Sequence, residues 1–283
     1  MSFIYVLPQI VKMMNVNYVC ILNLMSIVIC LVVILVFSAK NVNQLRRRKR
    51  MKIVKFDKIR KIHKKMVVAG AGKAGKTFFS VAHPYRTLFL STELNQANLA
   101  IDAAVQIGRC KAENISTVDV TSLGILEEAL EWAGKNLSEF DILVIDNLTG
   151  VEEMITDKIS DADKKDTFKF YRILGQSMRK IIQAISAIPC HQVVIVHTKE
   201  QSNENSQQML RLNLGGNIAK NELRKSFNLI GYMKKERLKN ELLRKIVFED
   251  SSLTLNFIGG HPNLAHKETA DLTAIFNKID GRK

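Results

Sequence analysis

The sequence predicts an α/β fold with a mostly parallel central sheet flanked by helices. From Met66 onward, short apolar runs alternate with stretches of helical periodicity, as they do in βαβ units. The glycine-rich segment Gly70–Thr77 separates the first apolar run from the first helix. A later run, Asp141–Asp146, is nearly all apolar, which is typical of a strand buried on both faces. No internal repeat is present, so we expect one α/β domain.

The order of the elements follows from this pattern. Strands are expected at Met66–Ala69, Thr87–Ser91, Ile115–Thr121, Asp141–Asp146 and His191–His197, and helices from Lys76 onward and at Gln96–Ile107, Leu123–Lys135 and Lys169–Ile188. Two further runs, Phe227–Met233 and Leu242–Phe248, flank the charged turn Lys234–Asn240 and predict an antiparallel C-terminal hairpin. The connections Asn147–Thr167 and Lys199–Lys220 are predicted to be long polar loops, which in compact domains tend to be functional or disordered.

The segment Gly70–Thr77 reads GAGKAGKT and matches the P-loop pattern GxxxxGK[ST] in full. In this pattern the glycines let backbone N–H groups cradle phosphates, Lys76 reaches the β- and γ-phosphates, and the Thr77 hydroxyl binds Mg²⁺. We therefore expect ATP and Mg²⁺ as ligands. The predicted nucleotide-binding residues are Gly70, Ala71, Gly72, Lys73, Ala74, Gly75, Lys76, Thr77 and Phe78.

Asp146 ends its apolar strand, where a Walker B aspartate is expected. Its carboxylate would hold Mg²⁺ through water, across the sheet from Thr77, so these two residues are the predicted metal site. The alternative is an ordinary strand-terminal aspartate that starts a turn with Asn147.

The ordered set of motifs resembles the RecA-like P-loop ATPases. More narrowly, it resembles phage-encoded AAA-domain nucleotide-binding proteins that accompany single-strand annealing and recombination. The resemblance covers residues 60–265 and rests on GAGKAGKT, STE, DILVIDNLTG, the long helix before VVIVHTKE, and LGGNIAKNELRKSFNLIGYM. Two features depart from the pattern: Asn228 stands where relatives often carry Asp, and no arginine can be assigned as a finger.

The resemblance implies two further catalytic residues beside Lys76. Many AAA proteins carry a glutamate directly after the Walker B aspartate, but this chain has Asn147 there. RecA-like ATPases place the glutamate after a neighbouring strand, which matches Glu93 in Ser91-Thr-Glu; a carboxylate there can orient the attacking water. His197, at the end of the fifth strand, is expected to sense the γ-phosphate. The alternatives are a helix-capping or surface Glu93 and a purely structural His197.

The resemblance also implies partners. In the family, the loops after the fourth and fifth strands face the axis of a ring or filament and touch DNA. By position these are Asn147–Thr167 and Lys199–Lys220, and their phosphate contacts would come from Lys158, Lys164, Lys165, Lys199, Arg211 and Lys220. We therefore expect a DNA-dependent ATPase in phage recombination or replication, forming a homo-oligomer with single-stranded DNA and an annealing or DNA-binding protein as partners.

The N-terminal residues 1–50 leave two interpretations open. Residues 1–65 carry fourteen Lys/Arg and one Asp, a net +13, whereas residues 66–283 carry 28 Lys/Arg and 26 Asp/Glu, a net +2. The uncharged Val16–Phe37, followed by the basic Arg46–Arg50, predicts a single-pass anchor with a cytoplasmic NTPase domain. Alternatively, residues 1–50 are a mis-called extension: three consecutive arginines are what a translated ribosome-binding site gives, and Met51 is the start of a cytoplasmic protein.

The remaining expectations follow from these alternatives. We expect the ATPase domain at residues 51–265 and a C-terminal tail at 266–283. The cysteines show no metal-binding or disulfide spacing, which fits a reducing compartment. Two other functions compete with the DNA-dependent ATPase: a membrane-tethered NTPase acting on protein assembly or transport, and a nucleotide-dependent binding switch with little turnover.

Overall fold

The computed structural model describes residues 62–202, 208–238, 241–248 and 260–282. These residues belong to one compact unit. The apolar segment Val16–Phe37 and the start at Met51 lie outside the described residues. Within the described part of the chain, no helix has the length and apolarity needed to cross a membrane.

The body is built on one mostly parallel sheet with the strand order β3-β2-β4-β5-β1-β7-β8-β9, and β6 pairs with the end of β5. The strands are β1 (Lys65–Gly70), β2 (Thr87–Ser91), β3 (Ile115–Asp119), β4 (Ile142–Asp146), β5 (His191–Ser202), β6 (Gln208–Leu212), β7 (Leu229–Leu238), β8 (Glu241–Val247) and β9 (Lys267–Thr269). All pairs from β3 to β7 are parallel, and the pairs β5–β6, β7–β8 and β8–β9 are antiparallel. This confirms the predicted α/β fold, with a mostly parallel central sheet and antiparallel strands at its C-terminal side.

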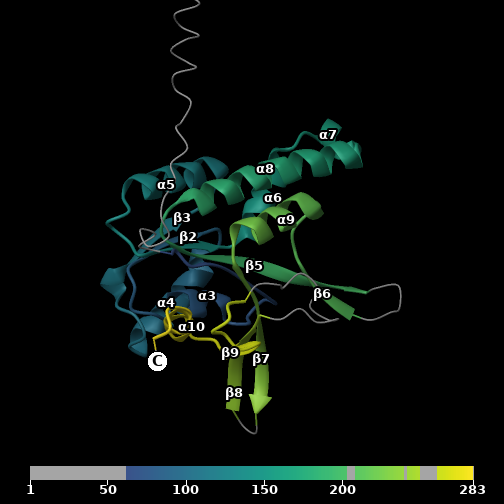
Figure 1. Ribbon diagram of the computed structural model, residues 1–283. Coiled ribbons are helices and arrows are strands. Elements are labelled where there is room, and N and C mark those ends of the chain that lie inside the picture. Colours follow the sequence, from purple (N-terminus) through teal and green to yellow (C-terminus); the bar gives the residue numbers. More distant parts are fainter. Residues whose placement is uncertain (1–61, 203–207, 239–240, 249–259, 283) are drawn as a thin grey trace, which may run out of the picture. The chain divides into compact units, whose positions relative to one another are not determined.

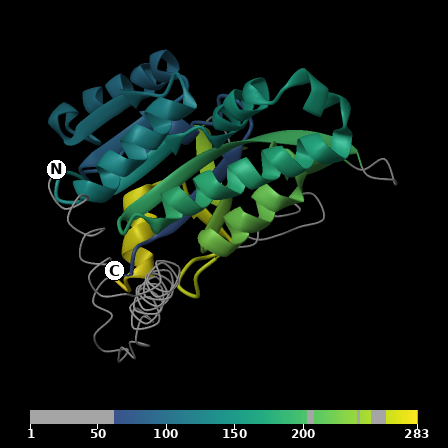
Figure 2. The same cartoon turned by 90° about the horizontal axis from the view of Figure 1, so that it is seen from above.

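Helices cover both faces of the sheet (Figure 1). They are α3 (Lys76–Val81), α4 (Leu94–Gln106), α5 (Leu123–Lys135), α6 (Leu148–Lys158), α7 (Asp161–Lys165), α8 (Thr167–Ala187), α9 (Gly216–Ser226) and α10 (Leu272–Ile279). On one face, α5, α6, α8 and α9 pack on the sheet, with α8 and α9 side by side; on the other lie α3, α4 and α10 (Figures 1 and 2).

Strand β1 shows why both faces are filled. Successive side chains of a strand point to opposite faces, so Val67 and Ala69 join the core under α8, while Met66 and Val68 join the core under α10. All four side chains are fully buried. The continuous apolar run of β1 is the sequence signature of such a strand.

The segment Asn147–Thr167, predicted as a polar loop, instead forms the helices α6 and α7. That prediction was wrong because the polar residues are only the solvent face of α6, whose inner face buries Leu148, Val151 and Ile155. Two caps define the helix starts. The Asn147 side chain accepts a hydrogen bond from the Gly150 N–H at 2.7 Å, and the Ser160 hydroxyl accepts one from Asp163 at 3.2 Å.

The segment Lys199–Lys220 is not a loop either. Strand β5 continues to Ser202 and turns back as β6, and α9 begins at Gly216. Leu212 and Leu214 are buried, which ties this return to the core. The charged residues Lys234–Leu238, predicted as a turn, continue β7, so the predicted C-terminal hairpin is present but longer than expected.

Residues 266–283, expected to be a tail, are part of the same body. Strand β9 pairs with β8, and α10 buries Leu272, Ile275 and Phe276 in the core under the sheet. The ring of Phe276 lies near those of Tyr85 and His191, and the Lys64 ammonium stands 5.1 Å from its centroid. The apolar spacing of α10 is the signal that the sequence reading passed over.

The burial of α10 predicts a stability effect. Phe276→Ala should lower the free energy of unfolding of the full chain by about 3–5 kcal/mol, because it removes a fully buried ring and leaves a cavity. Phe168→Ala is the matched control, since Phe168 is 80% exposed. Urea unfolding would measure both. Equal midpoints for the two variants would mean that the C-terminal helix is not packed as described.

Candidate nucleotide site

The P-loop lies between β1, which ends at Gly70, and α3, which begins at Lys76. Gly75 has a φ of 100°, a backbone conformation that glycine adopts without steric cost. Gly70 is required for a different reason: a Cβ atom there would lie 2.9 Å from the Met233 carbonyl oxygen of β7. The two glycines therefore let the loop turn tightly and let β1 pass close to β7.

Lys76 is buried at the base of this loop. Its Nζ donates hydrogen bonds to the carbonyl oxygens of Gly70, at 2.9 Å, and Ala71, at 2.8 Å. Burial lowers the pKa of Lys76, and the nearby carboxylates of Asp146 and Glu93 partly oppose that effect. Among the described residues this ammonium donates to these two carbonyls, and a phosphate in the loop would give it a stronger, charge-assisted partner.

Asp146 and Thr77 meet beside the lysine. The Thr77 hydroxyl donates a 2.7 Å hydrogen bond to Asp146 Oδ2. Burial raises the pKa of Asp146 to about 6, although the Thr77 hydrogen bond and Lys76 lower it; Glu93 adds a smaller upward effect. A hydroxyl and a carboxylate are the oxygen ligands that Mg²⁺ prefers when phosphates and water complete its shell, so the two residues fit this ion.

Glu93 lies at the start of α4, one strand away from Asp146. Ser91 of β2 is the register partner of Asp146 in β4, so the polypeptide after each strand emerges at the same edge. The Glu93 side chain is exposed, and its Oε1 accepts a 3.2 Å hydrogen bond from Asn147 Nδ2. Its carboxylate is therefore oriented by one contact and still open to water.

His197 stands across from the P-loop, where it is the register partner of Gly70 between β5 and β1. Burial is the main reason that the pKa of its half-buried ring is lowered; Lys76 adds to the effect, and Glu93 and Glu153 oppose it. The imidazole is therefore neutral at physiological pH. The His197 backbone N–H donates to Thr149 Oγ1 at 3.1 Å, and its carbonyl accepts from the Asn213 N–H at 2.8 Å.

The structure thus brings together the sequence-predicted residues from four strands at the carboxyl edge of the sheet, the usual ligand position in such folds. They are Lys76 and Thr77 after β1, Glu93 after β2, Asp146 ending β4 and His197 in β5. Ala71, Gly72 and Lys73 are exposed in the loop, and Ala74 is buried. The Phe78 side chain packs on the core under α3, so only its backbone remains available to a ligand.

Two residues of the site escaped the sequence reading. Asn147 and Thr149, in the first turn of α6, connect Glu93 to His197 through the hydrogen bonds described above. The helix cap formed by Asn147 is visible in the sequence DNLTG, and it was the available signal. Arg244 of β8 also reaches the loop: a Cβ atom on Gly75 would lie 2.6 Å from its Nε.

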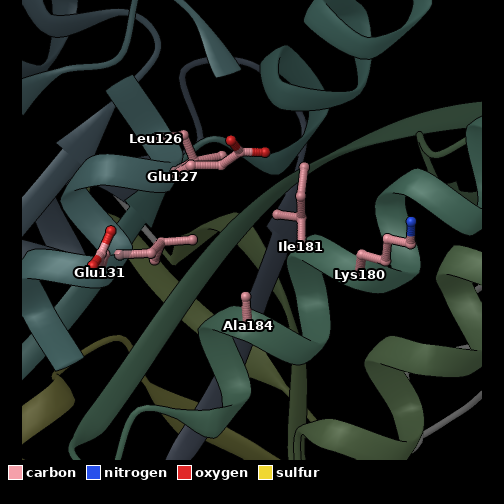
Figure 3. A pocket seen from close by; sticks show the side chains of 7 residues that line it. Leu126, Glu127, Glu131, Lys180, Ile181 and Ala184 are labelled. Atoms are coloured by element: carbon pink, nitrogen blue, oxygen red, sulfur yellow. The ribbon is translucent and has the colours of Figure 1, made fainter. Parts of the chain in front are cut away.

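A separate cavity of about 380 Å³ lies between α5 and α8 (Figure 3). Its floor is apolar and its rim carries charge; the lining residues are Leu126, Glu127, Leu130, Glu131, Lys180, Ile181 and Ala184. None of them belongs to the elements that carry the P-loop, Glu93, Asp146 or His197. This cavity is therefore distinct from the candidate nucleotide site.

Comparison with known proteins adds the following. The AAA domain family matches residues 62–256. Among solved structures, a KaiC-like protein from the hyperthermophilic archaeon Pyrococcus horikoshii OT3 aligns over 65% of this chain and 77% of its own, with 12% sequence identity and a TM-score of 0.39. No curated protein sequence shows a significant match.

The raised pKa of Asp146 predicts a pH-dependent stability. Because the folded state holds this proton more tightly than the ordinary pKa of 3.8 allows, the free energy of unfolding should fall between about pH 4 and pH 6 as the pH rises. Asp146→Asn, which cannot ionise, should therefore raise the midpoint of thermal unfolding of the ligand-free chain at pH 7.5. The gain should disappear near pH 4.

Asp119→Asn is the control, because Asp119 is exposed. Both variants would be followed by circular dichroism in a chelating buffer without nucleotide. A lower midpoint for Asp146→Asn at pH 7.5 would contradict the conclusion that burying the ionised Asp146 carboxylate lowers the stability of the folded state.

Proposed function

The chain belongs to the AAA domain family of nucleotide-binding P-loop ATPases, and on that premise we propose that it hydrolyses ATP with Mg²⁺ and couples hydrolysis to single-stranded DNA. The proposal that the chain hydrolyses ATP rests on the exposed Glu93 carboxylate, which lies next to the Asp146–Thr77 pair. One carboxylate is placed to act on water, and the other is placed to hold a cation.

Each residue of the site has a separate task in this proposal. The P-loop backbone and Lys76 bind the β- and γ-phosphates, and Thr77 and Asp146 hold Mg²⁺, which neutralises charge on the phosphates. Glu93 orients the attacking water or accepts its proton. Because Asn147 is a neutral donor to one Glu93 oxygen, it fixes the carboxylate while the second oxygen stays available.

His197 is proposed as the γ-phosphate sensor. Its neutral ring can donate one hydrogen bond to a phosphate oxygen. Its backbone is held on both sides, by Thr149 and by Asn213. A movement of the His197 ring on phosphate binding would therefore be passed through these hydrogen bonds to α6 and to the residues that follow β6.

Support for the DNA half comes from a group of cations that we call the β5–β6 cluster, consisting of Lys199, Arg211, Lys220 and Arg224. Lys199 and Arg211 are direct cross-strand partners, an arrangement of like charges that destabilises a sheet unless an anion is present. The Nε of Arg211 is buried without a hydrogen-bond partner. A phosphate would offset the repulsion between Lys199 and Arg211, and one of its oxygens could accept a hydrogen bond from Arg211 Nε.

The balance of charge in the β5–β6 cluster also favours binding of a phosphate. The pKa of Lys220 is lowered by burial first and then by Lys199, Arg211 and Arg224, and Glu152 is the opposing carboxylate. Glu152 already accepts a 2.6 Å hydrogen bond from the Gly215 N–H. The cluster therefore holds more positive charge than the nearby carboxylate neutralises.

The lysines of α7 are less suited to phosphate contacts than the sequence suggested. Lys164 pairs with Asp161 at 3.7 Å, and Lys169 pairs with Asp163. These charges are compensated within α7 and the start of α8. We therefore assign the phosphate contacts to the β5–β6 cluster rather than to Lys164, whose charge Asp161 compensates.

Aromatic residues near the β5–β6 cluster favour a single strand. Tyr171 of α8 is 47% exposed, and its ring lies against the start of α9: a Cβ atom on Gly216 would be 3.9 Å from it. Lys220 follows one turn later on the same helix. Exposed aromatic rings beside cations stack on unpaired bases, which a duplex does not present.

One copy of the β5–β6 cluster offers few phosphate contacts. We propose that a ring or filament of copies repeats this weak site along the strand, so that affinity rises with the number of engaged subunits. The resemblance to phage proteins that accompany single-strand annealing supplies the setting, namely recombination, with an annealing protein as partner.

The first prediction from this proposal concerns Glu93. Glu93→Gln should keep ATP binding but lower kcat by about 10² or more, because the side chain can no longer accept a proton. Glu128→Gln, at an exposed position of α5, is the control. Phosphate release under saturating ATP measures both. A kcat for Glu93→Gln equal to that of the control would assign the role to another residue.

The second prediction concerns DNA. In the double variant Lys199→Ala/Arg224→Ala, the slope of log affinity against log salt for a single-stranded oligonucleotide should fall by about 1.4, since each lost phosphate contact removes about 0.7. Both side chains are exposed, so folding should be preserved. Lys111→Ala, which removes an exposed lysine paired with Glu113, should leave the slope unchanged.

Fluorescence anisotropy at several salt concentrations, with ATP present, provides the measurement. If the wild-type chain does not bind the oligonucleotide at low salt, in a sample shown to be oligomeric, the proposed coupling to single-stranded DNA is wrong. An ATPase that works on another partner would then be the function.

A further inference from the structure

Arg244 lies on the phosphate-binding loop although it is far from the P-loop in sequence. A Cβ atom on Gly75 would be 2.6 Å from its Nε, 2.8 Å from its Cδ and 3.5 Å from its Cζ. The side chain thus rests directly on the Cα of Gly75, next to Lys76. Gly75 is favoured by its positive φ, and a side chain at this position would displace Arg244 from the loop.

The register of the β7–β8 hairpin explains how Arg244 arrives there. Met233 pairs with Ile246, and both are buried in the core against β1 and α3, so this face of the hairpin points toward the P-loop side. Alternation then places Lys235, its direct partner Arg244, and Arg237 on the same face. We call these three residues the basic face of the β7–β8 hairpin.

The carboxylates of the hairpin lie on its other face. Glu236 points away with Lys234 and is paired with it at 2.8 Å and with Lys267 at 2.5 Å. Among the residues that the structure describes, no carboxylate forms an ion pair with Arg244. Lys235 and Arg244, being like charges in direct register, repel each other, so an anion at this face would relieve an unfavourable arrangement.

The order of the strands indicates which anion would lie at the basic face of the hairpin. Reading across the sheet, β2 and β4, which precede or carry Glu93 and Asp146, lie on one side of β1, and β7 and β8 with Arg244 lie on the other. The P-loop sits between these two sides. A phosphate chain bound in the loop with its terminal phosphate toward Glu93 and Asp146 would turn its inner phosphates toward Arg244.

We propose that Arg244 binds the α- and β-phosphates of the nucleotide held by the P-loop of the same chain. The proposal rests on the proposed nucleotide site and extends it to the β7–β8 hairpin. The guanidinium donates to non-terminal phosphate oxygens, so it contributes to ATP and ADP affinity alike and not to the choice between them. Lys76, by contrast, reaches the β- and γ-phosphates, and Glu93 acts on the water that attacks the terminal phosphate.

The test is a calorimetric titration of the full chain with ATP and, separately, with ADP, each with Mg²⁺. Arg244→Ala should weaken both affinities by about tenfold or more, the size expected for loss of a charge-assisted hydrogen bond. Arg244→Lys, which keeps the charge but not the planar fork, should recover part of the loss. The kcat at saturating ATP should change much less than KM.

Lys245→Ala is the matched control. It removes the same charge from the next residue of β8, on the opposite face, where Lys245 Nζ donates to Thr269 Oγ1 at 3.1 Å. Its ATP and ADP affinities should stay within about twofold of wild type, since exposed pairs contribute little. Thermal unfolding of all variants would report any general loss of folding.

The outcomes separate this inference from the proposed function. If wild type binds ATP and Arg244→Ala binds ATP and ADP as tightly as Lys245→Ala does, the Arg244 assignment is wrong while the nucleotide site stands. A loss confined to ATP would also overturn it, because the contact would then be at the γ-phosphate. Absence of nucleotide binding by the wild-type chain would remove both the site and the inference.

Discussion

The hydrogen bond from the Thr77 hydroxyl to the Asp146 carboxylate, 2.7 Å long, is the contact on which the candidate nucleotide site is built. The two residues follow β1 and end β4, which are separated in the sheet by β5. They meet only if all three strands keep their register, with Gly70 beside His197 and Ile145 beside Val194. The bond does not offset the full cost of burying the carboxylate, since burial still raises its pKa to about 6. Burial of the ionised Asp146 carboxylate therefore destabilises the ligand-free site, and a bound divalent cation would offset this effect.

The first turn of α6 extends this contact into a connected set of hydrogen bonds. Asn147, directly after Asp146, contacts Glu93, and Thr149 contacts the backbone of His197. His197 lies two residues before Lys199, and its carbonyl holds Asn213 after β6. A change in the nucleotide at the P-loop thus has a short physical route to the β5–β6 cluster. The route consists of backbone and side-chain contacts within secondary structure, and packed elements of this kind rearrange between discrete states rather than gradually.

The parts that could be predicted from sequence are those whose signal is local. The P-loop motif, the apolar strand ending in Asp146 and the strand ending before Glu93 are each read within a few residues, and the parallel α/β fold follows from their alternation. The helices α6 and α7 were missed because their exposed faces are polar, although the caps at Asn147 and Ser160 were present. The positions of Arg244 and Tyr171 depend on strand register and helix packing between distant segments, which short-range patterns do not encode. The same limit applies to α10, whose apolar stripe is clear but whose place under the sheet is set by tertiary contacts.

The most direct test of the account is calorimetric titration of the full chain with ATP and Mg²⁺, comparing wild type with Lys76→Ala. The Lys76 ammonium is buried at the base of the phosphate loop, where it donates to the carbonyl oxygens of Gly70 and Ala71, so its removal should abolish measurable ATP binding. Lys135→Ala, which removes an exposed lysine paired with Glu131, should bind as wild type does. Undiminished ATP affinity in Lys76→Ala would contradict the assignment of the P-loop as the nucleotide site.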